Sequence, residues 1–205
     1  MNFSTSDKTS YMRGLLAALL LLPALCPAGA PTDYLRTTIE QVLVVLNETG
    51  TDSAAKREKI RAVINERFDY QAMSQRALAR NWKKASSEEQ ARFVKLFARM
   101  MQNTYLVMAE EYNNQVVEYG KETVRKQKYA QVKTIIVNNG RRIPVDYKLR
   151  LKDDKWLVYD VVIEGVSMIS NYRSSYQQIV KKDGMEGLLA KLETKLASSP
   201  HSSPR

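Results

Sequence analysis

The sequence predicts an α+β domain in which helices cover a curved antiparallel sheet of four to five strands. Two observations carry this prediction. Apolar residues recur at helical spacing up to about residue 112 and again beyond Gly165, but they alternate with polar residues in between. Turn-forming residues also divide the alternating segment into short strands that hairpins can join. A curved sheet of this kind can enclose a cavity, although filled and hollow domains share the same alternation.

Three helices are predicted before residue 83. The first spans residues 33–47 and stops at the turn-forming residues 49–52. Its apolar stripe consists of Leu35, Ile39, Val42, Leu43 and Leu46. A second amphipathic helix is predicted over residues 53–67, and a short third helix carries Met73 and Leu78 toward Trp82.

A long fourth helix is predicted from Ser86 to about residue 112. Ser86 and Glu89 form a capping-box pattern, in which each side chain accepts a hydrogen bond from the other residue's backbone N–H. The wide apolar face of this helix contains Phe93, Leu96, Phe97, Met100, Met101, Thr104, Tyr105 and Met108. Such a stripe is typical of either a filled core or the wall of a pocket.

Four strands are predicted between residues 115 and 163. The second covers residues 129–137 and ends at an Asn-Asn-Gly sequence, a strong hairpin signal. The third places Ile143, Val145, Tyr147, Leu149 and Leu151 on one face. The fourth, over residues 155–163, is expected to place Leu157, Tyr159, Val161 and Ile163 on one face, opposite Trp156, Val158, Asp160 and Val162.

Two further helices and a tail complete the predicted domain. One helix covers residues 167–182 and is broken at Asp183-Gly184, and the last carries Leu188, Leu189 and Leu192. The composition of residues 198–205 is typical of a disordered tail. The predicted folded domain is therefore residues 31–197.

The first 30 residues are typical of a secretory signal peptide. Lys8 and Arg13 precede an apolar run that is interrupted by Pro23, and small residues follow it. Cleavage is expected after Ala28 or after Ala30. The sequence has one cysteine, Cys26, which we expect not to be acylated because no small residue directly precedes it.

Charge and motif content restrict the possible functions. The chain carries a formal charge of +10, which favours encounters with anionic surfaces, and the expected export argues against a nucleic acid partner. The only histidine, His201, lies in the tail, and no hydrolase, metalloprotease or phosphate-loop motif is present. We therefore expect neither a catalytic residue nor a metal site. Asp160 is the candidate general base of an enzyme, but an ion pair with Lys or Arg is the simpler interpretation of that residue.

Several segments resemble the MlaC, or toluene-tolerance, family of periplasmic phospholipid carriers. The similarity extends from about Tyr34 to Leu196 and is densest at Phe68-Asp69, at Asn81-Trp82 and over the segment WLVYDVVIEGVS at 156–167 with the following Asn171-Tyr172-Arg173. The resemblance implies a deep apolar pocket that holds phospholipid tails as cargo, without a cofactor or catalysis. It also implies a monomer that shuttles lipid between the inner and outer membranes and maintains the lipid asymmetry of the outer membrane.

By the same resemblance, the partners would be an inner-membrane MlaD ring of an ABC transporter and an outer-membrane MlaA lipoprotein beside a porin. The residues expected to contact the lipid tails are Phe97, Met101, Tyr105, Tyr147, Leu149, Val161, Ile163, Val166, Ile169 and Tyr172. Arg173 is the candidate for the headgroup phosphate. Two alternatives remain open at this point: a periplasmic adaptor with a filled core, or a small-molecule enzyme on a similar cone-shaped fold.

Overall fold

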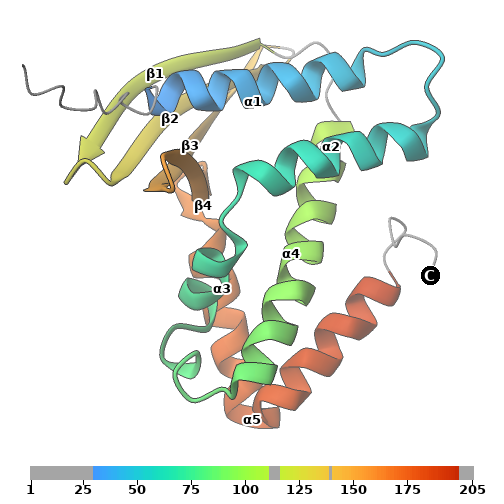
Figure 1. The fold of residues 1–205 in the computed structure, drawn as a ribbon, viewed down its shortest axis with the longest axis vertical. Coiled ribbons are helices and arrows are strands. Elements are labelled where there is room, and N and C mark those ends of the chain that lie inside the picture. Colours follow the sequence, from blue (N-terminus) through green and yellow to red (C-terminus); the bar gives the residue numbers. More distant parts are fainter. Residues whose placement is uncertain (1–29, 111–115, 139, 199–205) are drawn as a thin grey trace, which may run out of the picture.

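The computed structural model describes residues 30–110, 116–138 and 140–198 (Figure 1). Most of the expected signal peptide and of the expected tail lies outside these residues. The order of the elements is α1 (Pro31–Leu46), α2 (Ser53–Arg67), α3 (Tyr70–Leu78), a 3₁₀ turn (Ala79–Asn81), α4 (Ser87–Glu110), β1 (Val116–Arg125), β2 (Tyr129–Asn138), β3 (Arg141–Lys152), β4 (Lys155–Ile163), β5 (Val166–Ser167) and α5 (Met168–Ala197). The predicted α+β order of helices, strands and helices is confirmed.

Local side-chain contacts explain where the helices begin. The Asp52 carboxylate accepts hydrogen bonds from the N–H groups of Ala54 and Ala55 at the start of α2. The predicted capping box at α4 is present: Ser86 N donates to Glu89 Oε2 at 2.7 Å, and Glu89 N donates to Ser86 Oγ at 3.2 Å. Both contacts satisfy backbone donors that have no partner inside the helix.

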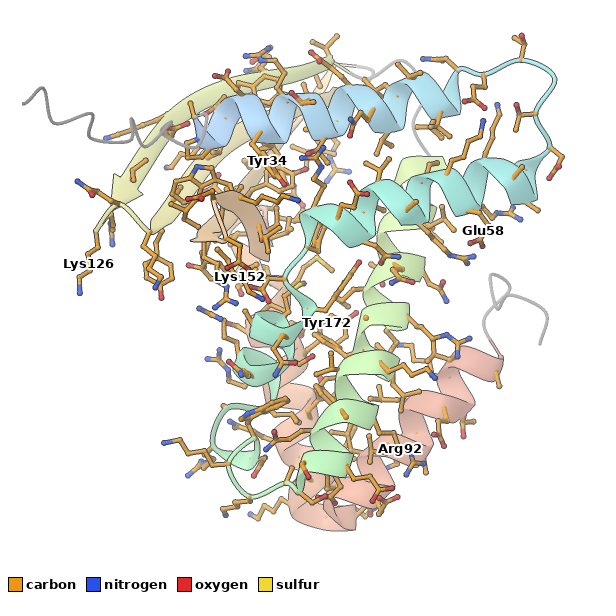
Figure 2. The ribbon with its side chains drawn as sticks, viewed as in Figure 1. Tyr34, Glu58, Arg92, Lys126, Lys152 and Tyr172 are labelled. Atoms are coloured by element: carbon orange, nitrogen blue, oxygen red, sulfur yellow. The ribbon has the colours of Figure 1, made fainter. Side chains whose placement is uncertain are left out.

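Helix α5 is interrupted at Gly184, as the Asp183-Gly184 signal predicted. Gly184 has φ 71° and ψ −175°, a conformation that only glycine adopts readily. The chain turns back at this point, so that the second half of α5 packs beside α4 (Figure 1). Arg92 on α4 reaches this second half and pairs with both Glu186 and Glu193 (Figure 2).

The sheet is antiparallel throughout, and its strands follow sequence order from β1 to β5. Asn138 at the end of β2 pairs with Arg141, and Gly140 between them has φ 79°. The β3–β4 hairpin turns at Asp153 and Asp154, whose φ angles of 48° and 57° fit a tight two-residue hairpin turn. The predicted four- to five-stranded sheet is thus confirmed.

Strand β4 departs from the predicted alternation. Lys148 of β3 pairs with Asp160, but the next residue, Leu149, pairs with Val158, so Tyr159 is an extra residue in a β-bulge. The bulge changes which side chains share a face. The expectation that Leu157 and Tyr159 lie on the same face as Val161 and Ile163 is therefore wrong: Trp156 and Val158 lie there instead.

Two main hydrophobic clusters divide the domain. The first joins α3, α4 and α5, and its largest members are Phe93, Phe97, Tyr176, Met73, Met101 and Leu189. The second lies on the face of the sheet that α1 covers, and it includes Leu35, Val132, Val145, Leu149, Trp156, Val158 and Val161. Figure 1 shows the two regions, with α1 across the sheet and the α3–α5 helices below them.

Within the described residues, none of the helices combines the length and the apolar character needed to cross a bilayer.

Candidate functional site

An apolar cavity of about 180 Å³ lies between the sheet and the α1–α2 helix pair. Helix α1 contributes Tyr34, Leu35, Thr38, Ile39, Val42, Leu43 and Leu46. Helix α2 and the residue after it contribute Ile64, Arg67 and Phe68. The strands contribute Val117, Ile136, Val145, Tyr147, Leu149, Val158 and Val161.

The whole predicted apolar stripe of α1 lines this cavity. Each of its five residues, from Leu35 to Leu46, is part of the wall, because positions three and four residues apart share one helix face. The start of α1 is attached to β1 by two hydrogen bonds to Glu122 Oε2, from Thr32 N at 2.8 Å and from Thr32 Oγ1 at 2.5 Å. The Arg36 guanidinium also stacks over the Tyr119 ring of β1 at 4.2 Å.

The sheet provides the opposite wall through residues that face each other across β3 and β4. Tyr147 pairs with Val161, and Leu149 pairs with Val158 beyond the bulge. Directly opposed residues of an antiparallel pair point to the same face, which here is the cavity face. The bulge therefore determines which β4 side chains reach the cavity.

Tyr147 is the polar-tipped residue of the sheet wall. Burial raises the pKa of its phenol to about 12, since an ionised phenolate would lose its hydration there. The side chain is therefore neutral at any physiological pH. The sheet wall carries no charge, as an oil-like chamber requires.

Arg67 is the one charged residue among the described residues that line the cavity. Its guanidinium stacks over the Tyr34 ring at 4.4 Å, and its Nη2 donates to Gln41 Oε1 at 3.1 Å. Its Nε is buried and has no hydrogen-bond partner among the described residues. Arg67 is not among the residues predicted from the sequence, because a single arginine at a helix end carries no distinctive pattern.

The structure distributes the predicted tail contacts over two places. Tyr147, Leu149 and Val161 line the cavity. Ile163 packs against the same sheet cluster without lining the cavity. Val166 is 62% exposed.

The predicted residues of the helical region lie apart from the cavity. Phe97, Met101 and Ile169 are buried in the α3–α5 cluster, where Tyr172 packs against Phe97 with ring centroids 5.4 Å apart. Figure 2 shows Tyr172 among these helices. The side chain of Tyr105 lies outside the described part of the chain.

Two polar candidates have local structural roles. Arg173, the predicted phosphate ligand, donates from Nε to the Arg76 backbone oxygen at 2.8 Å. The buried Asp160 carboxylate accepts from Lys148 Nζ at 2.9 Å and from Ser167 Oγ at 2.8 Å. The predicted ion pair of Asp160 is confirmed, and this carboxylate is occupied in joining β4 to the start of α5.

Among the residues that the structure describes, no group of three or more His, Cys, Asp or Glu residues is placed to hold a metal ion.

The fold and the cavity define the class of protein: a small α+β domain built around an apolar chamber. The model of the family described as MlaC protein matches residues 36–194, so this chain belongs to the MlaC family. The resemblance inferred from the sequence is confirmed.

Two curated proteins and one solved structure resemble the chain. The toluene tolerance protein Ttg2D of Pseudomonas putida is 25% identical over 204 residues, which cover 92% of this chain and 95% of that protein. The intermembrane phospholipid transport system binding protein MlaC of Haemophilus influenzae is 25% identical over 130 residues, which cover 61% of this chain and 60% of that protein.

The solved structure is that of a phospholipid-binding protein from Ralstonia solanacearum in complex with a phospholipid. It matches with a TM-score of 0.73 and 23% identity, and the match covers 81% of this chain and 96% of that one. At this identity the match shows a shared fold. Together with the family match, it agrees with the α+β architecture described above.

Proposed function

We propose that this chain binds a phospholipid by its acyl tails in the α1–sheet cavity and carries it through the periplasm. The observation that carries the proposal is the cavity itself, whose walls are aliphatic and aromatic apart from Thr38 and Arg67. The MlaC family membership and the relatives named for phospholipid transport and binding support the same reading. The proposed role is binding and transport without catalysis.

The physical need for such a carrier follows from the cost of exposing hydrocarbon to water. Each methylene in water costs about 0.8 kcal/mol, so two acyl chains cannot cross an aqueous compartment unaided at a useful rate. A chamber lined by Leu, Ile, Val and aromatic side chains is a solvent similar to the bilayer interior. Transfer of the tails between the two is then nearly neutral, which permits both loading and release.

The size of the cavity implies that α1 moves when cargo enters. Its volume of about 180 Å³ is below the roughly 300–1,000 Å³ of pockets that bury drug-sized ligands. We propose that α1 separates from the sheet to admit the tails, while the Thr32–Glu122 contact holds its first turn in place.

The oligomeric state, the export and the partner proteins complete the proposal. We propose a monomer, exported by the signal peptide of residues 1–30, that exchanges lipid with an inner-membrane MlaD ring and an outer-membrane MlaA lipoprotein. Such exchange would maintain the lipid asymmetry of the outer membrane. The strongly basic chain, with a formal charge of +10, favours encounters with anionic partners in these steps.

Native mass spectrometry of gently purified protein tests the proposal. We expect wild-type protein to carry a diacyl phospholipid, and Val161→Arg to carry at least about tenfold less because it places a charge against the tails. Val166→Arg is the matched control: Val161 is 1% exposed and lines the cavity, whereas Val166 is 62% exposed and does not. The control should retain wild-type lipid.

Two results would contradict the proposal. Wild-type protein that is repeatedly isolated without lipid, and takes none from vesicles, would favour an adaptor with a collapsed cavity. Equal lipid retention by both arginine variants would show that the lipid lies elsewhere. Thermal unfolding of each variant checks that a loss of lipid is not a loss of the fold.

A further inference from the structure

We propose that Arg67 binds a phosphodiester at the rim of the cavity, so that the cavity selects phospholipids over neutral diacylglycerols with the same tails. This inference rests on the proposed function, because it assumes that the tails occupy the cavity. It assigns the headgroup end of the site to the C-terminal end of α2, away from Arg173. The ligand chemistry is a phosphate oxygen, and the lipid headgroup is its proposed source.

Arg67 is a half-buried cation whose described partners are uncharged. A cation next to an apolar chamber is expensive unless it is paired, and buried arginines normally have an anionic partner. Arg150, whose side chain is 25% exposed, follows this rule and pairs with the Asp69 carboxylate. The described partners of Arg67 are only an amide, from Gln41, and the ring of Tyr34.

The protein uses only part of the N–H donors of Arg67. The guanidinium has five N–H groups in a planar fork that suits two phosphate oxygens at once. One Nη2 donor is used by Gln41, whose side chain is exposed on α1. The Nε donor is buried and has no partner among the described residues. The guanidinium therefore extends from the surface into the protein and retains donors for an anion.

The Arg67 guanidinium is oriented by the cavity wall. Tyr34 lines the cavity and also stacks on Arg67, with 4.4 Å between the guanidinium carbon and the ring centroid. Figure 2 shows Tyr34 on the side of α1 that faces the sheet and α2. An arginine that is already held in one orientation loses less conformational entropy when it binds an anion.

The chain offers a matched control in Arg36. Its guanidinium also stacks on a tyrosine, Tyr119, at 4.2 Å, so the two arginines share the same type of contact. Arg36 is exposed and does not line the cavity. Replacing either arginine by glutamine removes one positive charge, but only Arg67→Gln should change lipid selection.

In the experiment, delipidated mature protein is incubated with vesicles. The vesicles contain phosphatidylglycerol and diacylglycerol with identical acyl chains. Native mass spectrometry then gives the ratio of the two bound lipids. We expect wild type and Arg36→Gln to favour the phospholipid, and Arg67→Gln to reduce this ratio by about tenfold, the usual size of a charge-assisted hydrogen bond. Diacylglycerol uptake should stay unchanged. Arg67→Lys keeps the charge without the planar fork and should give an intermediate ratio.

The other outcomes each overturn the inference in a recognisable way. An equal reduction in Arg36→Gln and Arg67→Gln would assign the effect to net charge. Saturable, Arg67-dependent binding of inorganic phosphate with an unchanged lipid ratio would identify a site for free phosphate. A wild-type protein that takes up neither lipid would refute the proposed function, whereas uptake of both lipids without discrimination would refute only the role of Arg67.

Discussion

The α3–α5 region and the α1–sheet region bury similar side chains but differ in how completely they are filled. In the helical region, Phe97 contacts Phe93, Tyr172 and Tyr176 with ring centroids between 5.4 and 5.9 Å apart. In the other region α1, with the end of α2 beside it, lies over a sheet, and the facing side chains leave about 180 Å³ between them. Three helices can interlock on several sides, whereas helices that cover one face of a curved sheet leave space beside their contact line.

Buried apolar residues therefore have two distinct roles in this protein. Those of the helical region stabilise the domain. Those of the α1–sheet region line the cavity, and they leave part of their surface without a protein partner. Because leucines with the same exposure occur in both regions, the comparison can be tested by identical substitutions.

The largest expected effect belongs to Leu189→Ala in the helical cluster. Leu189 and Leu149 are both 0% exposed, but only Leu149 lines the cavity. Leu→Ala in a packed core costs about 2–5 kcal/mol, and the cost rises with the volume of the new void. In delipidated protein we expect Leu189→Ala near the upper end of this range and Leu149→Ala near the lower end, as measured by urea unfolding. Equal losses would show that the two regions are packed alike.

The next largest loss of stability is expected when the ion pair between Asp69 and Arg150, which joins the two regions, is broken. Asp69 begins α3 by accepting a hydrogen bond from Ala72 N, and it also pairs with Arg150 of β3. Arg150→Met leaves a carboxylate that is only 3% exposed without its cation, which typically costs about 3–5 kcal/mol.

Two probes of Arg150→Met reveal how tightly the regions are coupled. Trp82 packs on the helical cluster, so both probes are measured in a Trp82→Phe background, where Trp156 is the remaining tryptophan. If the regions unfold as one unit, the near-ultraviolet signal of the aromatic helical cluster and the fluorescence of Trp156 should be lost together on urea unfolding. Separate transitions would show that the cavity region opens independently. The double variant Asp69→Asn with Arg150→Met should recover part of the loss, because it leaves no unpaired charge.

The smallest effect concerns Tyr147 at alkaline pH. Its pKa is raised by burial to about 12 from an ordinary value of 10.0. The phenol of the unfolded chain ionises near pH 10, whereas that of the folded protein stays neutral to a higher pH. The folded state therefore keeps its full stability below pH 10 and loses stability as the pH rises toward 12. The loss for Tyr147 amounts to at most about 3 kcal/mol.

Delipidated Tyr147→Phe should therefore lose less stability than wild type between pH 10 and pH 11.5, with similar stability at pH 7. Burial also raises the pKa values of Tyr70 and Tyr176, so part of the alkaline slope should persist in the variant. Urea unfolding across this pH range gives the comparison. Identical slopes in the two proteins would mean that the Tyr147 phenol is well hydrated.

Local signals in the sequence were sufficient for much of the fold. The Ser86–Glu89 capping box, the break at Gly184 and the hairpin turn that contains Gly140 each depend on contacts within a few residues, so their physics is visible in the chain itself. The β4 bulge was not predictable in this way. It depends on how Lys148 and Leu149 of a neighbouring strand are paired, and no single-strand pattern records that pairing.

The cavity was harder to predict than the fold. Periodicity correctly identified Leu35 and Ile39 of α1, and Phe97 of α4, as members of apolar stripes, but it cannot tell a stripe that meets protein from one that meets empty space. Phe97 and Met101 of the α4 stripe were predicted to contact the lipid tails, but they pack against α5. The sequence showed the apolar stripe of α1, but it did not show that this stripe faces a sheet across a cavity.

The extra residue in β4 has a consequence for what can enter the chamber. Because of it, two consecutive side chains, Tyr159 and Asp160, both point away from the sheet's oily face: one packs on the helical cluster and the other receives Lys148. In a strictly alternating strand, one of them would have to turn inward. A further phenol or a carboxylate would then face the cavity, so a single inserted amino acid leaves only Val158 and Val161 as the β4 part of the wall.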